Sequence, residues 1–571
     1  MASGSEPQSP LGRRLAVARG DEPADLVLKG GKVLSVFTRE WLDADVAVVD
    51  GFVAGVGSYE GRETIDASGR HVVPGFVDAH VHLESSKLLP DEFARLIVPL
   101  GTTTVVADPH ELANVLGTDG VHWFADLCGD GLPLDVWFMA SSCVPASRFE
   151  SPRRRFSSGD LEGLLRRRRV LGVAEMMNFP GVIAGDPAEL AKLGLQGGMH
   201  VDGHAPGVRG PSLQAYAAAG IRSDHEAREL EEGRERLRAG LFLLIREGSA
   251  ARNLDALVPL LVEYGPDRIA FCTDDREPEH IADDGHLNGI VRRAVAAGVP
   301  PEDALVAASH SGARWHGLRD VGAVAPGYQA DILLFPDLER FEPELVLTHG
   351  NAFAPAERPE VPDWVRNTVR IGRLHGERLA VPARDGRIRV VGVIPGQIVT
   401  EALADEPTVA DGVIVADASR DLAKLAVFER HLGTGRVGVG FVRGFGLERG
   451  ALASTIAHDA HNIVVVGMSD AEMLVAVSRL AELGGGIVAV DGETVTAELP
   501  LPLAGLISDQ RLESVIASSR ACHDAAQALG CRLDSPFQTM AFLGLSVIPH
   551  LKLTDRGLVD VDAFELVDLW L

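Results

Sequence analysis

The sequence predicts an α/β protein: a TIM-type (β/α)8 barrel, a small β-sheet domain built from segments on both sides of the barrel, and a C-terminal mixed α/β domain. Between residues 72 and 275, eight apolar, strand-like runs alternate with helical stretches of about 10 to 18 residues, the pattern of repeated βα units. Turn-rich segments of similar composition lie before and after this region. The length of 571 residues suits several domains. A doubly wound open sheet is the alternative that the alternation alone leaves open.

The first segment predicts a tail followed by paired strands. The opening MASGSEPQSP is polar and rich in small residues, so we expect residues 1–23 to form a disordered tail. From Ala24, the runs DLVLKGGKVLSV and DVAVVDGFVAGVG and a run beginning at Thr64 predict β-hairpins with glycine-centred turns. Residues 24–71 are therefore assigned to the first part of the flanking sheet domain.

The barrel is assigned to residues 72–321. Its predicted strands are GFVDAH (75–80), TTTVVAD (102–108), DVWFMAS (135–141), VLGVAE (170–175), GMHVDGH (198–204), GIRSDH (220–225), LFLLIR (241–246) and RIAFCTD (268–274). Helices are expected between them, for example Glu111 to Cys128, Leu161 to Arg169, Pro187 to Gln196 and Glu226 to Ala239. A barrel of this kind carries its reactive groups at the C-terminal ends of its strands.

The remainder of the chain predicts two further parts. GAVAPGYQADILLF (322–335) and the turn-rich strands after it resemble the opening segment in composition. We therefore expect residues 322–391 to complete the flanking sheet domain. Residues 392–571 predict a C-terminal α/β domain, and the sequence assigns it no function.

The charge of the chain restricts its expected partners, and its cysteine usage indicates its expected location. Fifty-four basic against 81 acidic side chains give a net charge of −27, which disfavours nucleic acid and anionic membranes as partners. No segment supplies about 18 uninterrupted apolar residues, so no membrane span is expected. Five scattered cysteines without CxxC spacing favour a reducing, cytoplasmic location.

Six residues near predicted strand ends form a candidate metal site. His80 and His82 are two apart after an apolar strand, so both imidazoles can face the same side. Four further candidates end other predicted strands, namely Glu175, His204, His225 and Asp274. Because the strand ends of a barrel converge, this set suits two divalent ions about 3.5 to 4 Å apart, with Glu175 as a bridging carboxylate. The alternative interpretation is a set of hydrogen-bonded structural histidines.

Several motifs resemble a known family. PGFVDAHVHLESS (74–86) resembles the first metal motif of the amidohydrolase superfamily, many members of which carry a carboxylated lysine on strand four, where this chain has Glu175. The chain is similar to bacterial adenine deaminases from about Asp25 onward. The similarity is carried by DPHELANVLG (108–117), VAEMMNFPGV (173–182), DGHAPG (202–207), SDHE (223–226), CTDD (272–275), FERHLGTG (428–435), GFVRGFGLERGALAS (440–454), HDAHNIVVVG (458–467) and ELPLPLAGLISD (498–509).

The resemblance implies hydrolysis of adenine to hypoxanthine and ammonia in purine salvage, with two divalent metal ions, manganese or iron before zinc. Metal-activated hydroxide would attack C6 of the ring. Asp274 is the expected proton shuttle, and Glu111 is expected to hydrogen-bond or protonate the purine. The alternative for Glu111 is a carboxylate placed at a helix N-terminus. Asp108 and His110 are expected to position their loop or to bind an additional ion.

Some features leave alternatives open. Glu277 stands where the resemblance predicts histidine, Leu432 where a second histidine is usual, and Gln538 where an apolar residue is usual. These departures bear on substrate fit and rate, and another amidohydrolase acting on a modified purine or cyclic amide is the alternative enzyme. A catalytically silent barrel scaffold is the alternative from another class.

His458 and His461 share one side if their segment is helical, and local hydrogen bonding is their alternative role. A homodimer is expected from its general frequency among enzymes.

Overall fold

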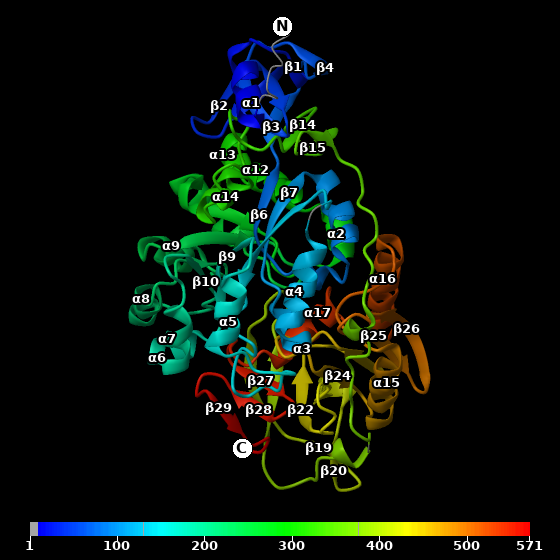
Figure 1. The fold of residues 1–571 in the computed structure, drawn as a ribbon. Helices are drawn as coiled ribbons and strands as arrows, with labels where there is room; N and C mark the ends of the chain where they lie inside the picture. Colours follow the sequence, from blue (N-terminus) through cyan, green and yellow to red (C-terminus); the bar gives the residue numbers. More distant parts are fainter. Residues whose placement is uncertain (1–8, 130, 375) are drawn as a thin grey trace.

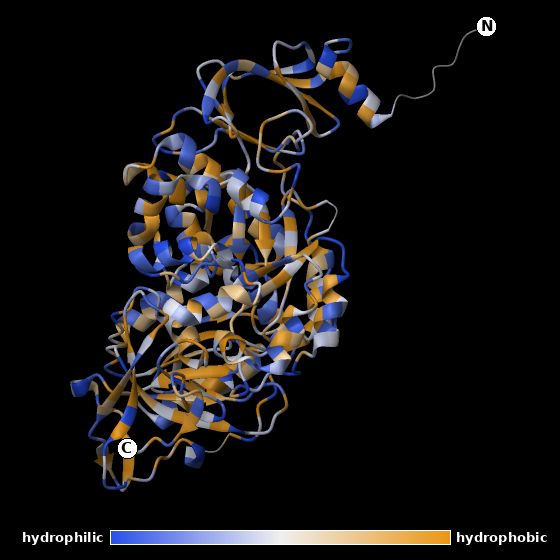
Figure 2. Cartoon of the chain, turned by 90° about the vertical axis from the view of Figure 1, so that its left-hand side faces the viewer, coloured by the Kyte–Doolittle hydropathy of each residue, from blue (hydrophilic) through white to orange (hydrophobic). Residues whose placement is uncertain are grey.

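The computed structural model describes residues 9–129, 131–374 and 376–571. Three parts follow one another along an elongated molecule: a β-sheet domain, a central barrel and a C-terminal domain (Figure 1). Hydrophobic residues concentrate on the strands of the barrel and of the C-terminal sheet (Figure 2). Within the described residues, no helix has both the length and the apolar character that crossing a membrane requires.

The segment predicted as a disordered tail contains a helix. Helix α1 spans Pro10–Arg19, and its N-terminus is capped by Ser9, whose side chain accepts a hydrogen bond from the Gly12 amide at 3.1 Å. Val17 packs into the core of the flanking sheet. The prediction of disorder is therefore wrong for residues 10–19, because a cap and two buried side chains stabilise this short helix. Residues 1–8 lie outside the described residues.

The flanking sheet joins segments from both sides of the barrel, as predicted. Strand β5 before the barrel pairs antiparallel with β14 after it. The eight strands are β1 (Ala24–Ser35), β2 (Glu40–Val49), β3 (Phe52–Gly57), β4 (Gly61–Asp66), β5 (His71–Pro74), β14 (Ile332–Phe335), β15 (Leu345–Thr348) and β16 (Asn351–Ala352).

Two details of this sheet differ from the predictions. DLVLKGGKVLSV forms the single strand β1 rather than a hairpin, because Gly30, with φ of +68°, accommodates a bulge while β2 pairs along both halves. DVAVVDGFVAGVG does form the hairpin β2–β3. The assignment of residues 353–391 to this sheet is wrong, because β17 (Ile388–Val393) hydrogen-bonds to β18 and β22 of the C-terminal sheet instead. At the other boundary, β5 extends three residues past the predicted limit of residue 71.

All eight predicted barrel strands are present. They are β6 (Phe76–Val81), β7 (Thr102–Ala107), β8 (Asp135–Ala140), β9 (Val170–Met176), β10 (His200–Gly203), β11 (Ser223–Asp224), β12 (Phe242–Arg246) and β13 (Ile269–Cys272). Strands β6 to β10 form one parallel run and β11 to β13 a second. A parallel bridge between Val81 and Asp274 connects the last strand to the first. The strands therefore follow barrel order, with their C-terminal ends at one mouth.

Helices surround these strands. The predicted helix over 111–128 is two helices, because Gly117 adopts a φ of +74° between them. The helices are α2 (Pro90–Ile97), α3 (His110–Leu116), α4 (Thr118–Leu127), α5 (Ser158–Leu165), α6 (Phe179–Ala184), α7 (Pro187–Leu193), α8 (Gly210–Ala218), α9 (Leu230–Arg238), α10 (Leu254–Tyr264), α11 (Pro278–Asp284), α12 (Leu287–Ala296), α13 (Pro301–Ala307) and α14 (His310–Trp315). The other three predicted helices are therefore present as α5, α7 and α9, with shifted ends.

The C-terminal domain is built on a second eight-stranded sheet that shares a hydrophobic core with the barrel. Helices α15 and α16 pack against opposite faces of that sheet, since they contact alternating strand residues. The elements of the C-terminal domain are β17, β18 (Thr400–Asp405), β19 (Thr408–Ala410), β20 (Val413–Val415), β21 (Ala423–Phe428), β22 (Val437–Arg443), β23 (Ala451–Ser454), β24 (Ile463–Gly467), α15 (Asp470–Leu483), β25 (Gly486–Asp491), β26 (Thr494–Pro500), α16 (Leu512–Ala528), α17 (Pro536–Ala541), β27 (Leu551–Thr554), β28 (Gly557–Asp560) and β29 (Glu565–Val567).

A fully buried arginine connects two strand ends of the barrel. The Arg236 guanidinium donates to the Asp224 carboxylate at 3.0 Å and to the Ala205 carbonyl at 2.7 Å. Asp224 in turn accepts from the Ala205 amide at 2.9 Å. Because Ala205 and Asp224 are the neighbours of His204 and His225, this network fixes the backbone that carries both histidines.

Replacing this arginine is expected to destabilise the protein. Arg236→Met leaves Asp224 as an unpaired buried charge, so we expect a loss of about 3 to 5 kcal/mol, measured as a lower midpoint of chemical denaturation. Arg238→Met on the same helix is the matched control, because its side chain is 66% exposed beside Glu231 and such pairs contribute about 1 kcal/mol or less. Equal shifts for the two variants would contradict the prediction.

Candidate metal centre

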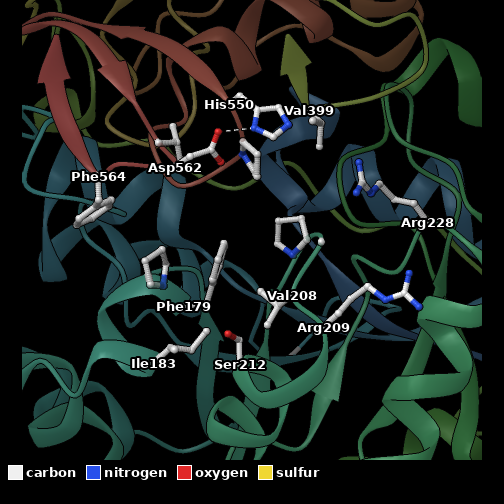
Figure 3. Close-up of a pocket in the computed structure, with 15 residues that line it drawn as sticks. Phe179, Ile183, Val208, Arg209, Ser212, Arg228, Val399, His550, Asp562 and Phe564 are labelled. Carbon is white, nitrogen blue, oxygen red and sulfur yellow. Dashed lines mark hydrogen bonds and ion pairs between the residues drawn. The ribbon is translucent and has the colours of Figure 1, made fainter. Parts of the chain in front are cut away.

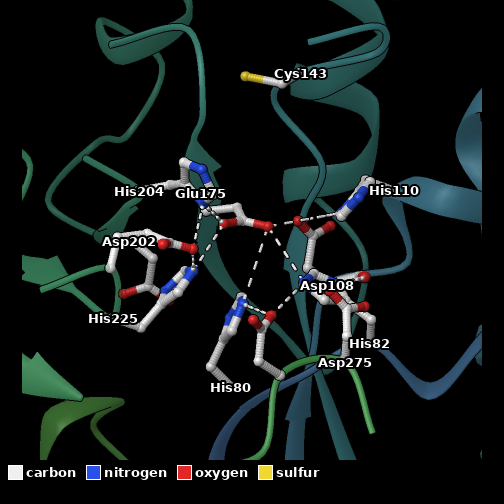
Figure 4. A network of polar contacts seen from close by, with 12 residues as sticks. His80, His82, Asp108, His110, Cys143, Glu175, Asp202, His204, His225 and Asp275 are labelled. Atoms are coloured by element: carbon white, nitrogen blue, oxygen red, sulfur yellow. Dashed lines mark hydrogen bonds and ion pairs between the residues drawn. The ribbon is translucent and has the colours of Figure 1, made fainter. Parts of the chain in front are cut away.

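The six predicted residues meet at the barrel mouth. Figure 4 labels five of them, His80, His82, Glu175, His204 and His225. None of them is more than 4% exposed. Each lies at or just beyond the C-terminal end of its strand: His80 and His82 at β6, Glu175 in β9, His204 after β10, His225 after β11 and Asp274 after β13. The structure therefore brings together every residue of the predicted set.

Glu175 lies between two groups of histidines. Its Oε1 is 3.3 Å from His82 Nε2 and 3.9 Å from His80 Nε2. Its Oε2 is 2.9 Å from His204 Nδ1 and 3.3 Å from His225 Nε2. One carboxylate oxygen thus faces each group, which is the arrangement that a bridging carboxylate requires.

Asp274 joins the first group. Its Oδ1 is 3.1 Å from His82 Nε2 and 3.5 Å from His80 Nε2. Its backbone φ of +54° is uncommon for a residue other than glycine, and such strain persists only where the surroundings impose it. The backbone bridge to β6 imposes it here, since the Asp274 amide donates to the His80 carbonyl at 3.0 Å.

Two buried imidazole nitrogens without hydrogen-bond partners among the described residues and the negative charge of Glu175 both fit a bound cation. His80 Nε2 and His204 Nε2 are buried and have no hydrogen-bond partner among the described residues. Burial opposes ionisation of Glu175, yet the surrounding histidines hold its pKa well below the usual range. Burial also opposes the charged form of His225, but hydrogen bonding to Glu175 outweighs it and raises the pKa of His225 to about 9. Imidazole and carboxylate donors of this kind bind divalent metals, and a metal would displace protons from the imidazoles.

Asp108 and His110 belong to the same cluster. His110 Nδ1 is 3.1 Å from Asp108 Oδ2 and 3.8 Å from Glu175 Oε1. The Asp108 carbonyl lies 3.0 Å from His82 Nδ1. With His82 and Glu175, the two residues form a group of four metal-ligand atoms within 4.8 Å of one another. They therefore border the predicted metal site instead of forming a distant one.

Glu111 points toward the C-terminal domain. Its Oε1 accepts a hydrogen bond from Ser85 Oγ at 2.7 Å, and its Oε2 lies 3.5 Å from His461 Nε2. Burial raises the pKa of Glu111 to about 7, against the opposing charge of His458. Glu111 also lies in the first turn of α3, as the helix-terminus alternative expects, so the structure is compatible with both roles.

Arg246 and Glu226 are among the site residues that sequence reasoning missed. Arg246 Nη1 donates to Asp274 Oδ2 and to Glu226 Oε1, each at 2.5 Å. Glu226 Oε1 also lies 3.4 Å from His204 Nδ1. Arg246 ends the predicted seventh strand, so the rule that located the other residues could also have located it. Glu226 directly follows His225 in SDHE, but adjacency in a chain does not show which way a side chain points.

Residues of the C-terminal domain cover the barrel mouth. His458, Asp459, Phe542 and Leu545 line a cavity of about 20 Å³ together with ligand-set residues including Glu175. His110 Nε2 lies 3.3 Å from Asp459 Oδ1, so the two domains meet at the site itself.

The helical geometry considered for His458 and His461 is wrong, because residues 458–461 form a turn after β23. The turn still brings their rings together, with centroids 5.3 Å apart. His458 also stacks on Phe542 at a centroid distance of 4.5 Å. The two histidines therefore form part of the cover over the barrel mouth.

A larger cavity lies elsewhere. It measures about 610 Å³ and lies between the helical side of the barrel, near Phe179 and Val208, and the C-terminal residues His550 and Phe564 (Figure 3). It contains none of the six predicted ligands. Cavity size therefore does not locate the reactive centre here, and the side-chain chemistry does.

The three sequence departures occupy different surroundings. Leu432 is 64% exposed, so it does not reach the buried cluster. Gln538 is buried in α17, with its Nε2 lacking a partner among the described residues. Glu277 is buried and forms an ion pair with Lys87 at 2.8 Å.

The fold and the buried His/Glu/Asp cluster fit a metal-binding hydrolase of the amidohydrolase class, and the model of the amidohydrolase family matches residues 71–353. The model of the adenine deaminase C-terminal domain matches residues 397–565. The chain is 46% identical to "Adenine deaminase 2" of Carboxydothermus hydrogenoformans, covering 98% of this chain and 99% of the relative. It is 48% identical to an adenine deaminase of Methylobacterium nodulans, covering 98% and 99%, and 46% identical to one of Brucella suis, covering 96% and 95%. The chain belongs to the adenine deaminase family.

Metal content is expected to depend on Glu175. Glu175→Gln replaces the carboxylate whose two oxygens face the two histidine groups, so we expect the purified variant to retain at most half the divalent metal per chain of the wild type, measured by inductively coupled plasma mass spectrometry. Glu162→Gln, a change of the same kind on an exposed position of α5, should leave the content unchanged. Equal metal content in the Glu175→Gln variant would contradict a bridging role.

Proposed function

We propose that this protein hydrolyses adenine to hypoxanthine and ammonia, the reaction that serves purine salvage. The observation that carries the proposal is the buried His/Glu/Asp cluster, intact in a chain that is similar over nearly its full length to proteins named adenine deaminase. A silent scaffold would have no need to keep six ligand-type residues buried and facing one another.

Two divalent ions, manganese or iron before zinc, are the proposed cofactors. His80, His82 and Asp274 would hold one ion, and His204 and His225 the other, with Glu175 shared and Asp108 and His110 bordering the first. When bound, the ions would activate water for attack on C6 of the purine.

The chain's own residues would manage the protons. Asp274 Oδ1 faces the metal cluster, where it can accept a proton from the attacking water and pass it to the leaving amine. Arg246 binds the other oxygen of Asp274 and acts as a positioning residue. Glu111, with a pKa raised to about 7, can carry a proton at neutral pH and deliver it to a ring nitrogen.

The cover over the mouth has a part in this proposal. His458, Asp459 and Phe542 line the mouth beside Glu175, so they would face adenine bound at the metal centre. A cover of this kind would exclude bulk water and strengthen each charge interaction around the ring.

The setting of the reaction is also proposed. All five cysteines are free and buried, which supports a cytoplasmic location. A homodimer remains a prediction from general frequency, and light scattering of the purified chain measures it.

An assay of products tests the reaction. Manganese-loaded protein incubated with adenine should yield hypoxanthine and ammonia in equal amounts, while His80→Ala/His82→Ala should yield neither. A folded, metal-loaded wild type without turnover would overturn the proposal and direct attention to a modified purine or a cyclic amide.

A second experiment tests Glu111. Glu111→Gln keeps the shape of the side chain but cannot carry a proton, so we expect kcat to fall about 10²- to 10⁴-fold at unchanged metal content. Glu162→Gln again provides the control. Turnover within a factor of two of the wild type would eliminate the proton-transfer role of Glu111.

A further inference from the structure

A second cluster of potential ligands lies where the barrel meets helix α16. Glu277 precedes α11, Glu279 and His280 lie within it, and His523 lies on α16. We call these four residues the seam cluster. They belong to neither histidine group of the metal centre, and they connect the two large domains.

Three donor-to-donor distances connect the members of the seam cluster. Glu277 Oε2 is 3.8 Å from His280 Nδ1 and 3.9 Å from His523 Nε2. Glu279 Oε1 is 3.7 Å from His523 Nε2. Tetrahedral zinc with bonds of about 2.0 to 2.1 Å separates its ligands by roughly 3.3 Å, a few tenths of an ångström less than each of these three distances.

The two carboxylates are buried and incompletely satisfied. Glu277 is 1% exposed and Glu279 is 2% exposed. Glu277 Oε2, Glu279 Oε2 and His523 Nε2 have no hydrogen-bond partner among the described residues. Leaving such atoms unpaired is costly, and each one is expected to have a partner or a bound ion.

Protein donors reach only one oxygen of each carboxylate among the described residues. Lys87 Nζ binds Glu277 Oε1 at 2.8 Å, and Ser519 donates to Glu279 Oε1 at 2.6 Å. Burial opposes ionisation of Glu277, but Lys87 and the nearby histidines outweigh it and lower the pKa to about 2. Burial lowers the pKa of His280, which favours the neutral imidazole that binds metals. Each carboxylate therefore keeps one oxygen without a protein donor among the described residues.

We propose that the seam cluster binds one structural zinc ion through Glu277, Glu279, His280 and His523. His280 Nδ1, now 2.7 Å from Ser249 Oγ, would exchange that hydrogen bond for the ion. Two imidazoles and two carboxylates fill a tetrahedral shell and leave no open position, as structural zinc sites require. The ion would hold α16, and with it the C-terminal domain, against the barrel. This proposal is independent of the proposed function.

Zinc stoichiometry tests the proposal. The metal-stripped full-length chain is titrated with ZnCl₂, freed of excess zinc by gel filtration and analysed by mass spectrometry. His523→Ala should bind one zinc fewer per chain than the wild type. Arg520→Ala is the matched control, because it removes only the exposed Arg520–Asp283 ion pair between the same two helices, and it should bind as much zinc as the wild type. Equal zinc content in a folded His523→Ala variant would overturn the proposal.

A crystallographic measurement covers the case in which His523→Ala does not fold. Wild-type crystals grown with ZnCl₂ should show an anomalous peak at the zinc edge about 2.0 to 2.2 Å from donors of all four residues. An ordered seam cluster without such a peak, in crystals whose metal centre does contain zinc, would overturn the site.

Discussion

The backbone bridge between the first and last barrel strands is the constraint on which the site depends. The Asp274 amide donates to the His80 carbonyl, and the His82 amide donates to the Asp274 carbonyl at 3.2 Å. These two hydrogen bonds close the barrel and place three of the six metal-centre residues side by side. The other three, Glu175, His204 and His225, lie at the ends of their own strands, which parallel pairing aligns at the same mouth of the barrel.

The C-terminal domain completes the site because its separation from the barrel would expose a shared hydrophobic core. One continuous core includes Leu83 and Leu112 of the barrel together with Leu452 and Ile487 of the second sheet. Polar contacts then fix the covering turn: Glu150 Oε2 accepts from the Asp459 and Ala460 amides, each at 3.1 Å. Apolar burial thus supplies the attachment, and these hydrogen bonds set the position of the turn that reaches the metal centre.

The sequence was sufficient wherever a local pattern carries spatial information. Strand alternation placed His80 and His82 on one side, and strand ends located Glu175 and Asp274, because period-two geometry and parallel pairing are general properties of the backbone. Other features depend on tertiary contacts. Packing between surfaces determines three of them: the bulge at Gly30, the pairing of β17 with the C-terminal sheet, and the approach of Asp459 to His110. Arg246 was missed for a different reason, since an arginine at a strand end does not itself suggest a metal site.

The discontinuous flanking sheet has a consequence for how the chain is made. Strand β5 pairs with β14, whose residues follow about 260 positions later in the chain. At roughly 5 to 20 residues per second, a ribosome would take about 13 to 50 s to supply that partner. During this interval the edge of β5 has no native neighbour and can pair with other extended chains. The nascent barrel is therefore translated while its supporting sheet is half built, and this first sheet is where assistance during synthesis would matter most.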